Sequence, residues 1–530
     1  MRIFTLDTTL RDGTQGENVS FSPEDKLLIA RKLDELGIDY IEAGWPGSNV
    51  RDTEFFSVAR DLKLEHGRLV AFGAVRAPGK RAEDDPSLQA LVDAGTRVVS
   101  IFGKSIAVRG VTEEENLAMI SDTVRYLKSR GKEVLYDAEH FFDGYAANRE
   151  FALRTLETAK NAGADLLVLC DTNGGTLTSR LAAICAEVRK KFDGVLGIHA
   201  HNDSDLGVAN TLAAVEQGFS HVQGCMNGYG ERCGNANLTS ILANLELKMG
   251  HTAIGKDGSG RDRLQNLTQV ARFVAEVANL PLRNDQPYVG RSAFAHKGGV
   301  HVSAVLKNAA YEHIDPKAVG NRQRVLLSDL SGRGGVLYKL KQHGLEDKLD
   351  ETARRELLDR IRHLEMQGYE LEAAEGTFEL LVREALNPGL KFFEVLRYEV
   401  RTTAAGSTAT VTLKAQDGVH TATASGNGPV NALDLALRNC LSNLYPEIAN
   451  VRLTDYKVRM LDAKKGTAAR ARALVEWSDH RRSWTTVGIS ENTIEASWFA
   501  LVDALRLELM RLAEKDPTIE RVVEDYCWGV

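Results

Sequence analysis

The chain has 530 residues, of which 43% are hydrophobic and 26% are charged. These proportions are typical of a globular protein, and the length predicts more than one domain. The formal net charge of −7 is spread along the chain without a basic block, which argues against nucleic acid as a partner. No apolar run approaches the roughly 18–20 residues that a membrane-spanning helix needs, so no membrane segment is predicted.

The N-terminus and the cysteines both favour a cytoplasmic location. The chain begins Met1-Arg2-Ile3-Phe4-Thr5 and passes directly into a strand-like segment, without the features of a signal peptide. The six cysteines show no Cys-x-x-Cys spacing. Reduced thiols are therefore favoured over a framework of disulfides.

Roughly the first half of the chain alternates short apolar runs with amphipathic segments. The candidate strands are residues 3–7, 40–43, 69–74, 98–102, 133–136, 166–170, 195–199 and 221–225, and the clearest helices are 22–36, 113–130, 148–162 and 178–192. Eight such units favour a (β/α)8 TIM barrel. The alternative, a doubly wound sheet, would need a glycine-rich phosphate loop after the first strand, where this chain has DTTLRDG instead.

In a barrel of this type the active-site side chains gather where the strands end. Many polar residues fall at these ends: Arg11, Asp12, Glu42, Arg76, Asp137, Glu139, Asp171, Thr172, His199, His201, Asn227, Glu231 and Asn235. Any single one of them can be structural, but so many at one rim favour a functional site.

His199 and His201 close the seventh candidate strand. Residues i and i+2 of a strand point to the same side, so the two imidazoles would converge on one point, as two ligands of a metal ion do. Two unrelated polar residues at a strand end are the alternative.

Three motifs, taken together, resemble a known family. They are LRDGTQ (residues 10–15) with Lys26 further on, HAHND (199–203) and GYGERCGN (228–235). In this order and spacing the chain resembles the metal-dependent, acyl-CoA-condensing barrel family of isopropylmalate, homocitrate and citramalate synthases. The second motif departs from the family, which usually continues into Leu-Gly or Ser-Gly where this chain has SDLG (204–207). The resemblance continues through residues 294–301 and into the C-terminal region.

The resemblance implies a divalent metal ion held by Asp12, His199 and His201, with Asn235 as a fourth ligand or an outer contact. One carboxylate and two imidazoles suit Mn, Mg or Zn and leave positions open for a substrate. A 2-oxo acid would chelate the ion, which would polarise its keto group.

The resemblance also implies catalytic and substrate-binding residues. The catalytic candidates are Arg11, which would stabilise the alkoxide, Glu139, His301 and Tyr311. The substrate-binding candidates are Arg11, Tyr136, Asp137 and Thr172. The acetyl-CoA methyl proton needs a positioned base, and the favoured scheme is a relay centred on His301, with Glu139 orienting or activating water.

The remainder of the chain is expected to form two further parts. The predicted domains are a catalytic barrel (1–263), helical connecting subdomains (264–386) and a C-terminal regulatory and dimerisation domain (387–530). In the last of these, strands and a helix (430–440) are followed by a second set with a helix at 494–509, which indicates a duplicated βββα unit.

In the relatives a domain of this form binds the end-product amino acid between subunits, which implies a homodimer with an allosteric effector. The turns offered for such a ligand are Gly426, Asn427, Gly428, Gly488, Ser490 and Asn492. A dimerisation domain without a ligand is the alternative.

Two features bear on the oxo acid. Trp45, Phe72, Phe102 and Tyr136 suggest a small pocket and therefore pyruvate, and residues 488–498 resemble the citramalate branch of the family. This implies condensation of acetyl-CoA with pyruvate and isoleucine as the feedback inhibitor. A 2-isopropylmalate synthase, an acyl-CoA lyase, a metallohydrolase and a non-enzymatic amino-acid sensor are the alternatives.

Overall fold

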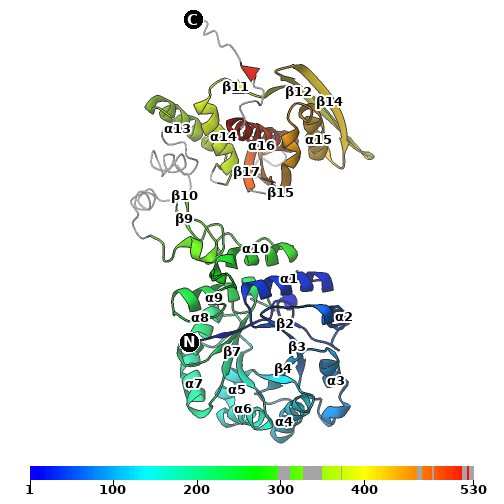
Figure 1. Cartoon of the computed structure of the whole chain (residues 1–530), viewed down its shortest axis with the longest axis vertical. Coiled ribbons are helices and arrows are strands. Elements are labelled where there is room, and N and C mark those ends of the chain that lie inside the picture. The colour runs from blue at the N-terminus through cyan, green and yellow to red at the C-terminus, as the bar shows by residue number, and fades with distance from the viewer. Residues whose placement is uncertain are drawn as a thin grey trace. The chain divides into compact units, whose positions relative to one another are not determined.

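A computed structural model of the chain describes residues 1–296, 311–325, 349–371, 373–461, 468–479, 483–515 and 522–523. The chain forms two compact units (Figure 1). The first contains residues 1–295 and 312–324, and the second contains residues 296–311 and 325–530.

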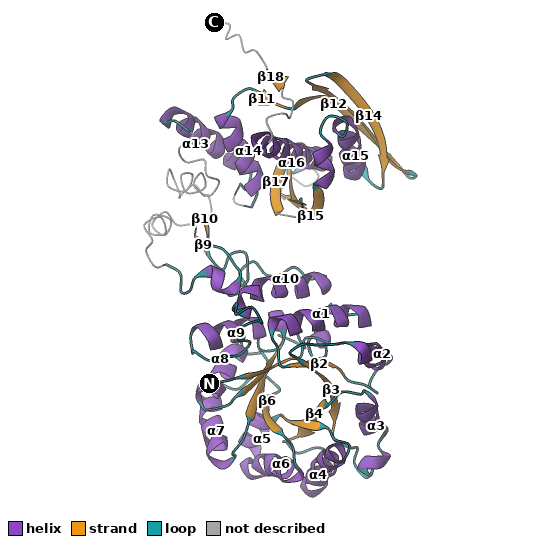
Figure 2. Cartoon of the chain, in the orientation of Figure 1, coloured by secondary structure: helices purple, strands orange, loops and turns teal. Residues whose placement is uncertain are grey.

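The first unit is a closed barrel of eight parallel strands surrounded by helices (Figure 2). The strands are β1 (Phe4–Asp7), β2 (Tyr40–Gly44), β3 (Arg68–Ala74), β4 (Val98–Lys104), β5 (Glu133–Glu139), β6 (Leu166–Asp171), β7 (Leu196–Ala200) and β8 (His221–Gly224). Each strand pairs with the next, and β8 pairs with β1 to close the barrel. This confirms the predicted TIM-barrel fold.

Helices follow the strands around the barrel. They are α1 (Pro23–Leu36), α2 (Val50–Val58), α3 (Pro86–Asp93), α4 (Glu113–Ser129), α5 (Phe141–Ala147), α6 (Arg149–Ala162), α7 (Thr178–Lys191), α8 (Gly207–Glu216), α9 (Leu238–Leu247) and α10 (Leu267–Val277). The start and end of α1 show how the local sequence sets these bounds. Ser22 and Asp25 form a capping box, and Gly37 ends the helix at φ 93° in the left-handed region.

Inside the barrel, an apolar layer lies below the polar carboxyl-terminal end. The apolar layer is formed by Leu6, Tyr40, Val70, Val98, Leu135, Leu166, Val168 and Cys170. Since these side chains fill the barrel from below, the polar residues at the strand ends are left to form a pocket above them.

The second unit contains two similar halves. β12 (Phe393–Thr403), β13 (Gly406–Ala415), β14 (Gly418–Gly426) and α15 (Pro429–Leu441) are followed by β15 (Arg452–Met460), β16 (Ala471–Ser478), β17 (Ser483–Ser490) and α16 (Thr493–Lys515). Each half has a three-stranded antiparallel sheet. Leu413 and Leu437 from one half share a core with Trp477 and Leu505 from the other. The predicted duplication of a βββα unit is therefore confirmed.

Two helices, α13 (Glu351–Met366) and α14 (Glu375–Leu386), precede these halves, in agreement with the predicted helical connection. The remaining short strands are β9 (Ala295–His296), β10 (Arg324–Val325), β11 (Leu390–Lys391) and β18 (Val522–Val523). The bounds of the three domains proposed from the sequence stay predictions.

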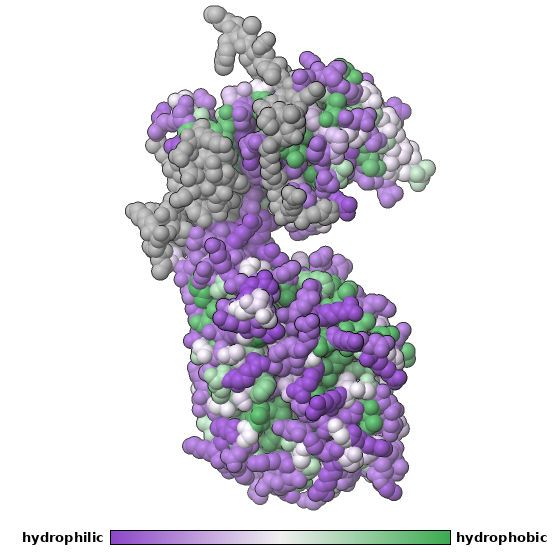
Figure 3. All heavy atoms as spheres, viewed as in Figure 1, coloured by the Kyte–Doolittle hydropathy of each residue, from purple (hydrophilic) through white to green (hydrophobic). Residues whose placement is uncertain are grey.

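The surface of the barrel unit is mixed in character. On the face in view, hydrophilic residues surround smaller hydrophobic areas (Figure 3). Within the described parts of the chain, none of the helices combines the length and the apolar character needed to cross a membrane.

Candidate metal centre and active site

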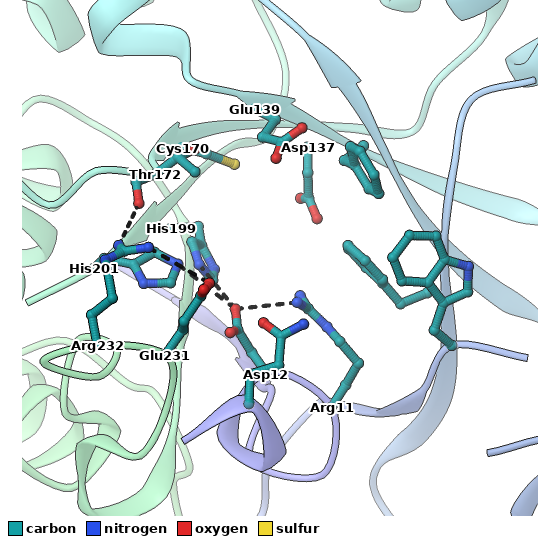
Figure 4. Close-up of a pocket in the computed structure, with 14 residues that line it drawn as sticks. Arg11, Asp12, Asp137, Glu139, Cys170, Thr172, His199, His201, Glu231 and Arg232 are labelled. Carbon is teal, nitrogen blue, oxygen red and sulfur yellow. Dashed lines mark hydrogen bonds and ion pairs between the residues drawn. The ribbon is translucent and has the colours of Figure 1, made fainter. Parts of the chain in front are cut away.

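A pocket of about 200 Å³ lies at the carboxyl ends of the barrel strands. Its lining comprises Arg11, Asp12, Gln15, Trp45, Phe72, Phe102, Asp137, Glu139, Cys170, Thr172, His199, His201, Glu231 and Arg232. Figure 4 shows that Asp12, His199 and His201 converge on one side of the pocket, while Asp137 and Glu139 face them from β5. Many of the strand-end residues that the sequence places at one rim therefore line this pocket.

Asp12, His199 and His201 form a compact group of potential metal ligands. Their ligand atoms all lie within 4.8 Å of one another, and all three residues are buried. The Nε2 atoms of His199 and His201 lie 3.5 Å and 3.8 Å from Asp12 Oδ2. The backbones of His201 and Asn235 form an antiparallel bridge, which brings the asparagine beside this group.

Unpartnered polar atoms support the metal interpretation. Asp12 Oδ1, His201 Nδ1 and Asn235 Oδ1 are buried and have no hydrogen-bond partner among the described residues. An unpaired buried polar atom is costly, so a carboxylate and an amide oxygen left in this state fit a site that binds a cation. The residues present therefore fit a divalent metal ion.

The electrostatics of the group favour the same interpretation. Burial alone would raise the pKa of Asp12, but the neighbouring groups, with the Arg11 cation as the strongest, lower it below its ordinary value. Burial lowers the pKa of His199 to about 4 and also lowers that of His201. An ionised carboxylate and two neutral imidazoles are the states in which these groups bind metals.

Arg11 is held firmly beside this group. Its Nε donates to Glu42 Oε1 at 2.6 Å, its Nη1 lies 3.2 Å from Asp12 Oδ2, and its guanidinium stacks 3.7 Å above the centre of the Phe72 ring. Burial raises the pKa of Glu42 to about 7, although Arg11 opposes this. Arg11 is thus a largely enclosed, oriented cation in the pocket, and Glu42 acts through it.

A hydrogen-bonded line connects His199 on β7, through Gln223 on β8, to Asp137 on β5. His199 Nδ1 lies 2.9 Å from Gln223 Oε1, and Gln223 Nε2 donates to Asp137 Oδ1 at 3.2 Å. Ser100 Oγ donates to the other carboxylate oxygen of Asp137 at 2.7 Å. The sequence analysis missed Gln223, and its signal was a glutamine within an otherwise buried strand.

Glu139 and Thr172 lie where the sequence predicts. Glu139 lines the pocket at the end of β5, and its Oε2 lies 2.6 Å from Lys104 Nζ. Thr172 Oγ1 accepts a hydrogen bond from the His140 backbone at 2.8 Å, so its own proton is available to a ligand. Arg232, which also lines the pocket, bonds to the Thr172 carbonyl at 2.8 Å and to Asp203 at 2.7 Å.

The prediction that Tyr136 lines the substrate pocket is wrong. Its side chain is fully buried among the apolar residues outside the barrel wall, and its hydroxyl lies 3.5 Å from the Gly103 carbonyl oxygen. Successive strand residues face opposite sides, so Asp137 and Glu139 point into the pocket and Tyr136 points away. The sequence reading ended this strand at Tyr136, whereas β5 continues to Glu139.

Other predicted rim residues serve the surrounding loops. Arg76 pairs with Glu115 and Asp122 on α4. Asp171 accepts a hydrogen bond from the Thr176 hydroxyl at 2.8 Å, and Asn227 donates to the Ala271 carbonyl at 2.8 Å. His301 lies outside the described residues. Tyr311 is 47% exposed and belongs to the other compact unit, so the roles given to these two residues stay predictions.

The predicted effector turns have local structural roles. A Cβ on Gly426 or Gly488 would lie 2.6 Å or 2.0 Å from the backbone of the following helix. Asn492 accepts a hydrogen bond from the Ile494 backbone near the start of α16. Gly428 is the N-cap residue of α15, Asn427 donates to Asn431, and Ser490 donates to Glu495. Effector binding at these turns stays a prediction.

Three family models match successive parts of the chain. The HMGL-like model matches residues 2–274, the model described as homocitrate synthase post-HMGL domain-like matches 288–368, and the LeuA allosteric (dimerisation) domain matches 372–508.

Curated relatives match over nearly the full length. The (R)-citramalate synthases of Aquifex aeolicus and Synechocystis sp. are 49% and 48% identical to the chain, over 97% and 96% of it and 99% and 96% of those proteins. The 2-isopropylmalate synthase of Methanocaldococcus jannaschii is 30% identical over 95% of this chain and 94% of that protein. With its barrel, its duplicated C-terminal unit and these matches, the chain belongs to the isopropylmalate, homocitrate and citramalate synthase family and is an enzyme of that class.

Proposed function

We propose that the chain is an (R)-citramalate synthase, which condenses acetyl-CoA with pyruvate to give citramalate and CoA, in the cytoplasm and as the first step from pyruvate toward isoleucine. The observation that carries this proposal is the 47–49% identity, over nearly the whole chain, to four proteins that are named (R)-citramalate synthase. The buried Asp12–His199–His201 group supports the metal-assisted chemistry that the reaction needs.

The aromatic side of the pocket supports pyruvate as the oxo acid. The Trp45 ring packs edge-on against Phe72 and Phe102, with ring centres 5.5 Å and 5.6 Å away. Three bulky rings packed together on one side of the pocket favour a methyl group over the branched side chain of 2-oxoisovalerate. The two arginines in the lining are already paired with carboxylates, which disfavours a second carboxylate, as in 2-oxoglutarate.

In the proposed mechanism, Asp12, His199 and His201 hold the metal ion, with Asn235 beside them. When bound, the ion supplies a Lewis acid that polarises the keto group of the oxo acid and fixes its orientation. Arg11 donates a charge-assisted hydrogen bond to the keto oxygen as negative charge develops there. Thr172 donates its hydroxyl proton to the oxo-acid carboxylate.

The acetyl-CoA half of the reaction needs a base and a water molecule. The base removes a proton from the acetyl methyl group, and the resulting carbon nucleophile forms a bond to the keto carbon of pyruvate. The keto oxygen takes the electron pair of the broken π bond and is then protonated to the alcohol. Water finally cleaves the thioester to release CoA. We assign proton removal to a relay centred on His301 and including Tyr311. Glu139, at the pocket edge on β5, orients the water.

Gln223 has a supporting role in this scheme. Its amide nitrogen donates to Asp137, so its amide oxygen must face His199 and accept from Nδ1. His199 therefore carries its proton on Nδ1 and presents the Nε2 lone pair to the metal position. A fixed tautomer of this kind is what an outer partner gives to a metal-binding histidine.

We further propose a homodimer regulated by isoleucine through the C-terminal unit. The match of residues 372–508 to an allosteric (dimerisation) domain supports an oligomer with an effector. Isoleucine is the effector expected for an enzyme that begins a pyruvate-derived route to that amino acid.

The choice of oxo acid is tested by supplying acetyl-CoA and Mn²⁺ with pyruvate, 2-oxoisovalerate or 2-oxoglutarate separately and measuring the release of free CoA. We expect kcat/KM for pyruvate to exceed that for 2-oxoisovalerate by about 10-fold or more, because each extra methyl group must displace an aromatic wall. A preference for 2-oxoisovalerate would instead identify a 2-isopropylmalate synthase.

The Gln223→Met substitution removes the amide and keeps the side-chain volume. We expect it to weaken Mn²⁺ binding by about 10- to 100-fold, since His199 loses the acceptor that fixes its tautomer. Calorimetric titration of the metal-stripped protein measures this, with His199→Ala as the variant that loses the site. Mn²⁺ binding as tight as in the unchanged protein would contradict the role of Gln223.

Glu139→Gln tests the role of the carboxylate on β5. We expect kcat to fall by about 10²- to 10⁴-fold, as is usual for loss of a proton-transfer group. The Mn²⁺ affinity should stay nearly the same, because Glu139 is not part of the Asp12–His199–His201 group. A variant with undiminished kcat would exclude Glu139 from the chemistry.

Regulation is tested by adding isoleucine, leucine or valine to the full-length enzyme. We expect isoleucine to inhibit CoA release and to raise the unfolding temperature, because a ligand that binds only the folded state stabilises it. If isoleucine changes neither property at saturating concentration, the effector proposal fails.

A further inference from the structure

Lys26, the lysine of the first sequence motif, has no part in the proposed mechanism. It lies on α1 and is only 1% exposed. Its ammonium group donates to the Ala43 carbonyl at 2.8 Å and to Asp52 Oδ1 at 2.6 Å. A buried charge is tolerated only with such partners, and losing one of them is strongly destabilising. The simplest interpretation is a link that holds α1, β2 and α2 together.

The Asp52 carboxylate extends this link to the loop after β2. Its Oδ2 accepts hydrogen bonds from the Trp45 backbone at 2.8 Å and from Asn49 Nδ2 at 3.1 Å. Gly44 allows the close approach, because a Cβ at that position would lie 2.7 Å from Asp52 Cγ. Lys26 and Asp52 therefore hold the backbone on both sides of Gly44, at Ala43 and at Trp45.

The Trp45 side chain continues the link into the pocket. Its ring packs edge-on against Phe72 and Phe102, which stack on each other with ring centres 5.5 Å apart. Phe72 also contacts Arg11, whose guanidinium group lies over the Phe72 ring. The position of Trp45 therefore affects the size of the pocket. Through Phe72, it also affects the surroundings of the Arg11 guanidinium group.

We infer that Lys26 is a positioning residue for oxo-acid specificity: its ion pair with Asp52 holds Trp45 against Phe72 and Phe102 and so limits the side chain that the pocket accepts. This inference rests on the proposed function, because it assigns the aromatic wall to the side chain of the oxo acid.

The test compares Lys26→Met with Asp52→Asn. Lys26→Met removes the ammonium group from both of its partners. Asp52→Asn removes the charge but keeps an oxygen that can accept from the Trp45 backbone. For Lys26→Met we expect the kcat/KM preference for pyruvate over 2-oxobutanoate, which is one methylene longer, to narrow by about 10-fold. Asp52→Asn should narrow this preference by a smaller factor. In both variants, the increase in KM for pyruvate should be larger than the decrease in kcat.

Arg76→Met is the matched control. Arg76 is also buried and ion-paired, with a side chain 6% exposed, but its partners Glu115 and Asp122 lie on α4 and do not line the pocket. It should lower the unfolding temperature without changing the preference for pyruvate. If the role of Lys26 were purely structural, Lys26→Met would also lower the unfolding temperature and leave the preference for pyruvate unchanged. That outcome would overturn the inference.

A second measurement does not depend on activity. The chain has five tryptophans, so protein labelled with 5-fluorotryptophan gives few ¹⁹F resonances, and Trp45→Phe assigns the one from Trp45. This resonance should shift or broaden in Lys26→Met and stay unchanged in Arg76→Met. If Lys26→Met does not fold, Asp52→Asn takes its place in the test, and its Trp45 resonance must also shift or broaden. An unmoved Trp45 resonance in either folded variant would refute the link.

The two hypotheses fail separately. If the unchanged enzyme prefers 2-oxoisovalerate, the proposed function is wrong, and the Trp45 resonance still decides whether Lys26 positions the wall. If pyruvate is preferred and the resonance does not move, the proposed function stands and Lys26 is only structural.

Discussion

A buried carboxylate that must stay ionised is the constraint on which the site depends. Asp12 is almost completely enclosed, so its charge is tolerable only because the Arg11 cation lies beside it. The histidines in turn are neutral because burial disfavours their charged form. Arg11 needs its own anion, Glu42, on the neighbouring strand. The polar rim is therefore one mutually dependent group rather than a set of independent residues.

The sequence predicted the histidine pair from its local spacing, whereas Asp12 was added to the pair by the family resemblance. His199 lies on β7 and His201 directly follows the end of that strand, so the alternation of an extended chain brings the two side chains to the same side. The number and order of the strands were predictable for a similar reason, since buried parallel strands appear as short apolar runs.

The sequence analysis failed where the outcome depended on strand phase or on contacts between distant strands. Tyr136 was assigned to the pocket together with Asp137, but the two are successive residues of β5 and therefore face opposite sides of the barrel wall. Gln223 belongs to no motif, and only the closure of the barrel brings it between His199 on β7 and Asp137 on β5. Arg232 lies within a motif, but its contacts with Thr172 and Asp203 are long-range.

The order of the strands also explains why the pocket has two unlike sides. Trp45, Phe72 and Phe102 come from β2, β3 and β4 or directly after them, which are adjacent in the barrel, so their rings meet on one side. Asp12, His199 and Asn235 follow or belong to β1, β7 and β8, which are adjacent on the other side. Arg11 touches both, through Asp12 and through Phe72. A short 2-oxo acid has the same division, with two oxygen-bearing groups at one end and an apolar group at the other. Under the proposed function, an oxo acid bound by its oxygens on the polar side must direct its remaining carbon toward the rings. The proposal therefore assigns the choice of oxo acid to the position of those rings and not to Asp12, His199 and His201.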